Sequence, residues 1–330
     1  MDVPQQLSAF AVAPGLADHL RHQAGIERIF RTISRGAAAL VLLLLGGVLI
    51  SLVVGSWPAL SQYSWSFLYT EAWNPVTEKF GALAPIYGTV ITSLIAMLIA
   101  VPISFGIAVF MTEICPTRLR APINTAIELL AAVPSIVYGI WGLFVVAPLL
   151  QHSLQPWLIE HLGEWPVIGF LFAGPPYGIG LFTAGLVLAV MVLPYITAVM
   201  REIFQMTPQP LREAAYGLGA TQWQVVWHVV VPWSRPGAIG GLMLGLGRAL
   251  GETMAVTFVV GNAHRIHGSL LAPGTTISAT IANEFTEAYG ELYTSSLIAL
   301  GLILFVITFT IIAAARLMLM RIESGTQKRV

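Results

Sequence analysis

Long runs of apolar residues dominate the chain and are separated by shorter polar connections. Four of the runs contain no Asp, Glu, Lys or Arg, and two more of similar length hold only a few ionisable residues. In chain order the six runs cover residues 36–55, 85–111, 123–150, 178–200, 237–261 and 297–315. A helix of about 20 apolar residues crosses the roughly 30 Å hydrocarbon layer of a bilayer. The pattern therefore predicts six membrane-spanning segments.

The runs are continuous rather than alternating, which favours helices over strands. A backbone exposed to lipid must satisfy its own hydrogen bonds, and a helix does this within one segment. Composition points the same way, because 56% of the residues are apolar and only 10% are charged, whereas a soluble domain carries about 25% charged residues. The predicted fold class is an all-α membrane protein with six transmembrane helices.

Arg and Lys residues fall in alternate connections. They occur before the first run, between the second and third, between the fourth and fifth, and after the sixth. Apart from Arg248 inside the fifth run, only Lys79 and Arg265 fall elsewhere. Because positively charged connections tend to remain in the cytoplasm, both termini are predicted to be cytoplasmic. The chain then divides into a cytoplasmic segment 1–35, a transmembrane domain 36–319 and a cytoplasmic tail 320–330.

The residues that the chain lacks also limit its function. Neither of its two lysines, Lys79 and Lys328, follows a glycine, so a Gly-Lys-Ser/Thr phosphate loop for ATP hydrolysis is absent. His264 and His267 lie close together without a third metal ligand at the usual spacing, and we expect both to face water. No catalytic residue, metal site or cofactor is assigned.

The connection at residues 201–236 contains the first informative motif. It includes Glu213, Ala214 and Ala215, then Gly219 after three more residues, and nine residues later an aliphatic-x-aliphatic-Pro sequence. This pattern resembles the EAA loop of type I ABC importer permeases, with valine at both aliphatic positions in place of the usual isoleucine and leucine. In that family the loop is the coupling helix that seats in a groove of the ATPase. The resemblance implies that these four residues contact an ATPase; an ordinary interfacial hairpin is the alternative.

The fifth run carries charges near its middle. Arg248 and Glu252 are four residues apart, so we expect them to be neighbours on one helical face. A charged residue at a helix centre costs about 2.5–3.5 kcal/mol on insertion scales, which predicts that both face the protein interior or an aqueous path. Two interpretations remain open: a neutral pair that fixes the helix rotation, or a guanidinium that meets a passing oxyanion. Thr253 is a further candidate for the same route, and glycines at every fourth position over residues 237–245 predict close helix packing.

A second resemblance covers most of the chain. Residues 247–258, Gly-Arg-Ala-Leu-Gly-Glu-Thr-Met-Ala-Val-Thr-Phe, resemble the signature of the PstC family of phosphate-importer permeases, as do residues 127–135 and 301–309. The likeness runs from about residue 46 to 319. It implies a MetI-like bundle with its core at about residues 85–315, and a role for Arg248 and Glu252 in phosphate passage.

The resemblance implies a membrane component of a transporter rather than an enzyme. Its substrate would be inorganic phosphate and its location the bacterial inner membrane. Its partners would be an A-type sister permease, two cytoplasmic ATPase subunits and a periplasmic phosphate-binding protein, with no nucleic acid. The alternatives are a permease for sulfate or molybdate, or an ion-coupled secondary carrier, which needs no EAA loop.

Overall fold

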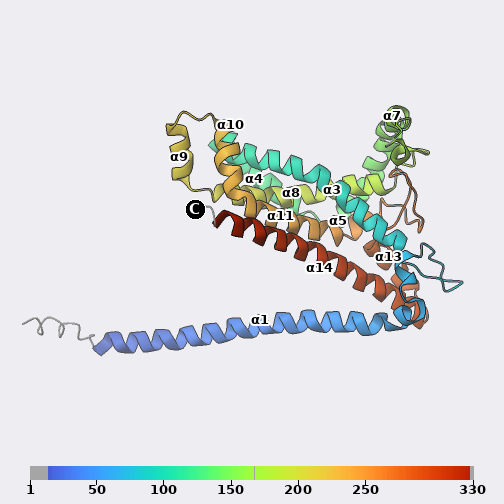
Figure 1. Ribbon diagram of the computed structural model, residues 1–330, viewed down its shortest axis with the longest axis horizontal. Helices are drawn as coiled ribbons and strands as arrows, with labels where there is room; N and C mark the ends of the chain where they lie inside the picture. The colour runs from blue at the N-terminus through green and yellow to red at the C-terminus, as the bar shows by residue number, and fades with distance from the viewer. Residues whose placement is uncertain (1–13, 167, 328–330) are drawn as a thin grey trace, which may run out of the picture. The chain divides into compact units, whose positions relative to one another are not determined.

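The computed structural model describes residues 14–166 and 168–327, and its elements there are helices joined by turns and loops (Figure 1). The predicted segment 1–35 is described only from residue 14, and the predicted tail 320–330 only to residue 327. Within the described ranges the extended pairings are two isolated bridges, Asn74 with Lys79 and Gly261 with Gly274. The all-α prediction is confirmed.

The chain forms two compact units, residues 1–54 and residues 55–330. The described part of the first unit belongs to helix α1 (Pro14–Tyr63). The second unit contains the end of α1 and all later helices, and it holds every candidate site residue.

Five helical segments of the described chain are long and apolar enough to cross a membrane. They are Glu27–Tyr63, Leu83–Ile114, Ser135–Leu162, Leu181–Gln205 and Glu291–Leu317. The predicted runs 36–55, 85–111, 178–200 and 297–315 coincide with four of these segments. The other two predicted runs need correction.

The third predicted run, 123–150, is not one helix. Helix α4 (Thr117–Ala132) ends before Val133, which is extended at φ −63° and ψ 129°. A proline disfavours helical backbone at the residue before it, and Pro134 acts on Val133 in this way. A second helical segment then runs through α5 (Ser135–Trp141), α6 (Ala147–Leu149) and α7 (Gln155–Leu162) with π-helical turns between them. The candidate span therefore begins about twelve residues later than predicted.

The fifth predicted run, 237–261, is also broken. Helix α11 (Val231–Leu250) ends at Gly251, and the short helix α12 (Met254–Thr257) follows after a turn. α12 packs closely on α5, where a Cβ atom at Gly139 would lie only 3.0 Å from the Met254 carbonyl oxygen. This tertiary contact, together with the low helix propensity of glycine, favours the break.

Three helices form the centre of the larger unit. α3 (Leu83–Val109) packs along α8 (Leu181–Gln205), and α11 packs against both. The predicted glycine spacing contributes directly: a Cβ atom at Gly241 would lie 2.6 Å from Val199 Cγ1, and one at Gly245 would lie 2.7 Å from Ile196 Cγ1. The glycines therefore let α11 approach α8 closely, as the sequence predicts.

The two ends of this bundle differ in character. The short helices α9 (Gln209–Gly217) and α10 (Gln222–Val225) stand at one end, and the end of α14 (Glu291–Gln327) lies near them (Figure 1). The helices α7 and α13 (Ile277–Glu284) lie at the opposite end. We refer to these as the α9 end and the α13 end.

Candidate functional site

The hairpin of α9 and α10 carries the predicted coupling residues. Pro208 precedes α9 with extended backbone, and after α9 the chain turns at Gly219, whose φ of +85° suits glycine. α10 begins with a capping box in which Thr221 and Gln224 satisfy each other's backbone amides. Local sequence thus defines both boundaries of the hairpin.

The predicted coupling residues lie on the outside of this hairpin. Glu213, Ala214 and Gly219 are exposed, whereas Ala215 is half-buried against the core. Leu218, in the turn between the two helices, is 90% exposed. A pocket of about 390 Å³ runs along the hairpin. Its lining residues are Ala215, Leu218, Gly219, Ala220, Gln224, His228 and Val229.

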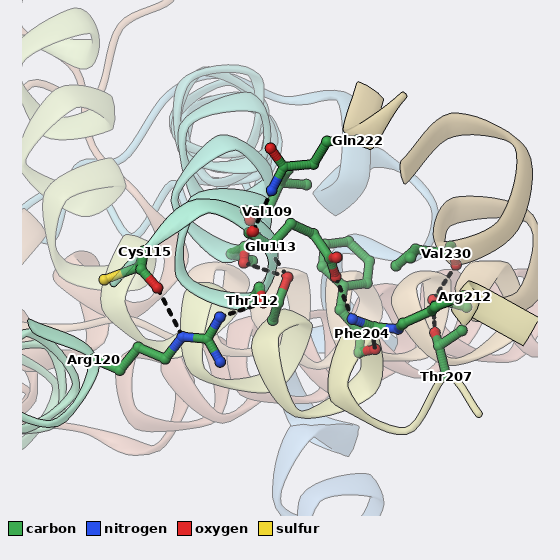
Figure 2. Close-up of polar contacts among 12 residues, drawn as sticks. Val109, Thr112, Glu113, Cys115, Arg120, Phe204, Thr207, Arg212, Gln222 and Val230 are labelled. Atoms are coloured by element: carbon green, nitrogen blue, oxygen red, sulfur yellow. Dashed lines mark hydrogen bonds and ion pairs between the residues drawn. The ribbon is translucent and has the colours of Figure 1, made fainter. Parts of the chain in front are cut away.

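A buried ion pair attaches the hairpin to the bundle, and the sequence pattern did not reveal it. Arg212 Nη1 donates to Glu113 Oε1 at 2.7 Å, and Arg212 Nη2 donates to the Phe204 carbonyl oxygen at 2.6 Å (Figure 2). The side chains of Glu113 and Arg212 are only 5% and 14% exposed. One available signal was the position of Glu113, a lone acid directly after a long apolar run.

The end of α3 receives further bonds near the same point. Gln222 donates its side-chain amide to the Glu113 carbonyl oxygen. From the other side, Arg120 donates to the carbonyl oxygens of Thr112 and Cys115, each at 3.0 Å (Figure 2). These carbonyl groups belong to the π-helical turn Phe110–Ile114 and the residue after it. Side chains thus satisfy the backbone acceptors that the end of the helix leaves open.

Arg248 and Glu252 do not form the expected pair. Arg248 lies in the last turn of α11 and is exposed, and its guanidinium lies 5.9 Å from the centroid of the Tyr195 ring. Glu252 lies beyond the helix end, is half-buried, and accepts a 3.4 Å hydrogen bond from the Ala255 amide. Within the described chain no ion pair joins the two residues. The expectation of one continuous helical face is wrong because α11 ends at Gly251.

Thr253 lies beside Glu252 in the same break. Its hydroxyl donates to the Gly251 carbonyl oxygen at 3.4 Å, and its carbonyl accepts from the Thr257 hydroxyl at 2.8 Å. Arg248 therefore lies in the last turn of α11, and Glu252 and Thr253 lie in the break that follows it. Arg248 is exposed there, whereas Glu252 and Thr253 are half-buried.

Glu128 and His264 also have partners that their sequence positions did not reveal. Glu128 accepts from Asn124 Nδ2 at 2.7 Å and lies 3.7 Å from Arg201 Nη2. His264 does not face water as predicted: it stacks on Trp73 with ring centroids 5.4 Å apart, and its Nε2 lies 3.6 Å from Glu284 Oε1. Burial lowers the pKa of His264, and the nearby Glu284 carboxylate opposes that effect.

Known protein families share both the sequence and the fold of this chain. Residues 102–324 match the family described as binding-protein-dependent transport system inner membrane component. A phosphate transport system permease protein PstC from Mesorhizobium japonicum is 64% identical over 307 residues, covering 93% of this chain and 94% of that protein. The PstC of Pasteurella multocida is 58% identical over 90% of this chain and 93% of its own length.

Similarity extends to more distant proteins. A probable phosphate transport system permease protein PstC from Methanocaldococcus jannaschii is 39% identical over 84% of this chain and 89% of that protein. A solved structure of the MetNI methionine ABC transporter in an inward-facing conformation matches with a TM-score of 0.52 at 16% identity, covering 72% of this chain and 94% of the other. A bacterial ABC transporter involved in alginate import matches with a TM-score of 0.50 at 17% identity, over 89% and 99% of the two chains. At these identities the solved structures show a shared fold, that of MetI-like ABC permeases.

Proposed function

This chain belongs to the family of binding-protein-dependent transport system inner membrane components, and from this premise we propose that it is the permease subunit of an ATP-driven importer of inorganic phosphate. The observation that carries the proposal is its 64% identity, over 93% of its length, to a phosphate transport system permease protein. Such a subunit is a membrane component rather than an enzyme, and it works with a partner ATPase and a binding protein.

Arg248 supplies the chemistry that phosphate recognition requires. Its planar guanidinium presents several N–H donors to an oxyanion. The side chain is exposed at the end of α11, and Glu252 and Thr253 follow it in the break before α12. Non-helical backbone at membrane depth is tolerated where it lines a cavity or is buried in protein. We assign Arg248, Glu252 and Thr253 to the translocation pathway on this basis.

ATP supplies the energy for uptake in this proposal. Moving one negative charge inward against an inside-negative potential costs about 2.3 kcal/mol per 100 mV, and phosphate carries about one to two such charges. We assign the ATPase contact to the hairpin at Glu213, Ala214 and Gly219, which are exposed, together with the half-buried Ala215. An A-type sister permease completes the pathway, two ATPase subunits bind in the cytoplasm, and a periplasmic phosphate-binding protein delivers the substrate.

We further propose six membrane crossings, with α11 and α12 together as the crossing that the five apolar segments do not include. Both termini then lie in the cytoplasm, as does the α9 end of the bundle. We also propose domain boundaries at residues 35 and 319; residues 1–13, 167 and 328–330 lie outside the described chain. The protein resides in the bacterial inner membrane.

Uptake of labelled phosphate by cells with and without this chain tests the proposal. We expect uptake that depends on the chain, that excess sulfate or molybdate leaves unchanged, and that is accompanied by copurification of an ATPase. Competition by sulfate or molybdate at equal concentration would instead favour the other oxyanions. Uptake that persists after loss of the partner ATPase would favour a secondary carrier.

A further inference from the structure

One residue of the bundle, Glu113, forms hydrogen bonds with both halves of the α9–α10 hairpin. Glu113, in the π-helical turn at the end of α3, accepts from α9 through its carboxylate and from α10 through its carbonyl oxygen. Both halves of the hairpin therefore bond to the same residue of a central helix. Figure 2 shows Arg212 and Gln222 reaching this point from the two sides of the hairpin.

Arg212 also connects α9 with a second central helix. The guanidinium that donates to Glu113 donates in addition to the Phe204 carbonyl oxygen, in the last turn of α8. The planar guanidinium holds the two acceptors in a fixed relation, which a lysine ammonium does not do. Since α3 and α8 pack along each other, one side chain links the hairpin to the pair of helices at the centre of the bundle.

The packing of α9 makes this polar link important. No residue of α9 is fully buried, and Arg212 and Ala215 are its half-buried positions. α9 itself thus has little apolar contact through which to move the bundle, whereas α10 packs into the core through the buried Val225. By contrast, the Glu113 and Arg212 side chains are removed from water, and a charge-assisted hydrogen bond in such surroundings is stronger than one at the surface.

We infer that Glu113 is the membrane-side anchor of the coupling hairpin, and that the Glu113–Arg212 ion pair transmits movement of α9 to α3 and α8. The inference rests on the proposed function, which makes α9 the site of ATPase contact. Glu113 and Arg212 are positioning residues in this account: they touch neither substrate nor nucleotide. Loss of the pair leaves ATP hydrolysis intact and removes its effect on the pathway.

The test uses the complete transporter in proteoliposomes and measures phosphate uptake per ATP hydrolysed. We expect Glu113→Ala to keep ATP hydrolysis while uptake per ATP falls by about tenfold or more, because the charge-assisted bond is lost. Glu113→Gln retains a neutral acceptor of the same shape and should lose less. Arg212→Lys keeps the charge but not the double link to Glu113 and Phe204, and should also be intermediate. Arg118→Gln, at an exposed arginine of α4, is the matched control and should behave as the wild type.

An assembled Glu113→Ala complex with wild-type uptake per ATP would overturn the inference. If that variant does not assemble, the same criterion applies to Glu113→Gln, which preserves volume. The wild-type complex decides the proposed function separately, since a complex that takes up no phosphate refutes it. In that case the anchor is tested without substrate, by thiol labelling of a protein that carries Cys115→Ala and Met254→Cys.

Met254 is exposed beside the helix break, so a cysteine at this position reports movement there. With the anchor intact, thiol labelling should proceed at different rates with and without ATP. Glu113→Ala should abolish this difference. A difference of wild-type size in the Glu113→Ala background would contradict the anchor whatever the transported substrate is.

Discussion

At the scale of single residues, the proposed translocation pathway depends most on Arg248. Its guanidinium is exposed and lies near the face of Tyr195 rather than in an ion pair with Glu252. A cation near an aromatic face is held in place without neutralisation of its charge. Within the described chain, no ion pair with a carboxylate occupies the N–H donors of Arg248. This arrangement suits transient binding of phosphate.

Substitution of Arg248 tests this assignment. We expect Arg248→Ala to lower phosphate uptake roughly 10- to 100-fold, because a hydrogen bond to a charged group contributes about 1.5–3 kcal/mol. Arg248→Lys should be intermediate, since lysine keeps the charge and loses the planar donors. The measurement is the initial rate of labelled phosphate uptake, with the amount of assembled complex as the control. An Arg248→Ala variant with wild-type uptake removes this residue from the pathway.

His264 makes a pH-dependent contribution to stability. Burial holds its pKa below the ordinary value of 6.5, so the folded state favours the neutral ring. The stabilisation is complete above about pH 6.5, where the unfolded chain also has a neutral ring, and is lost as the pH falls from there toward the lower folded-state pKa. We expect His264→Asn to reduce the loss of thermal stability between pH 7 and pH 5. The exposed His267 is the control, and His267→Asn should leave the pH profile unchanged.

The residue scale also shows what sequence alone can predict. The identity of Arg248 and Glu252 as unusual charges was readable, because a charge in an apolar run is costly. Their separation was not, because it depends on where α11 ends. The partner of Glu113 was equally unreadable, since Arg212 lies 99 positions away and was counted only as a positive charge of a cytoplasmic connection.

At the scale of helices, the apolar runs predicted which residues lie in apolar surroundings better than they predicted where each helix is continuous. Residues 123–150 and 237–261 are apolar throughout most of their length, yet each contains a break, at Val133 and at Gly251. Lipid or protein surroundings select apolar side chains on both sides of a break, so hydropathy does not reveal it. Proline marks the first break, whereas prolines 102 and 194 lie inside continuous helices. Tertiary contacts decide between these outcomes.

The glycine spacing of α11 was the most accurate prediction at this scale, and it can be tested. Adding a Cβ atom at Gly241 places it 2.6 Å from Val199 Cγ1, so Gly241→Ala should separate α11 from α8. We expect a loss of about 1–3 kcal/mol, the usual cost of overpacking. Gly240→Ala is the matched control, because nothing lies within 4 Å of its Cβ position. In thermal denaturation of the purified complex, Gly241→Ala should be less stable than Gly240→Ala. Equal stability of the two variants would show that the contact between α11 and α8 tolerates a larger side chain.

At the scale of the whole molecule, the bundle separates the proposed ATPase contact from the loops at its opposite end. The hairpin proposed to contact the ATPase stands at the α9 end, and α13 with its neighbouring loops stands at the other (Figure 1). The break that holds Glu252 and Thr253 lies between α11 and α12, and α12 packs against α5, α8 and α13. A movement that begins at the hairpin can reach this break through α8, against which both α11 and α12 pack.

Contact between Glu213 and the ATPase predicts uncoupling by a bulky side chain. Glu213→Trp should retain ATP hydrolysis and lose most phosphate uptake, because the exposed face of α9 no longer fits its partner. Glu202→Trp, at an exposed acid near the end of α8, is the control and should keep its uptake. Uptake per ATP equal to that of the wild type in Glu213→Trp would remove Glu213 from the contact.

The most direct measurement of the central claim is accumulation of labelled phosphate in proteoliposomes that contain the complete complex, with ATP inside the vesicles and the binding protein outside. We expect phosphate to rise above its external concentration only when ATP and the binding protein are both present, and sulfate to remain excluded. Accumulation driven by an ion gradient without ATP, or equal accumulation of sulfate, would contradict the assignment of this chain to a phosphate importer.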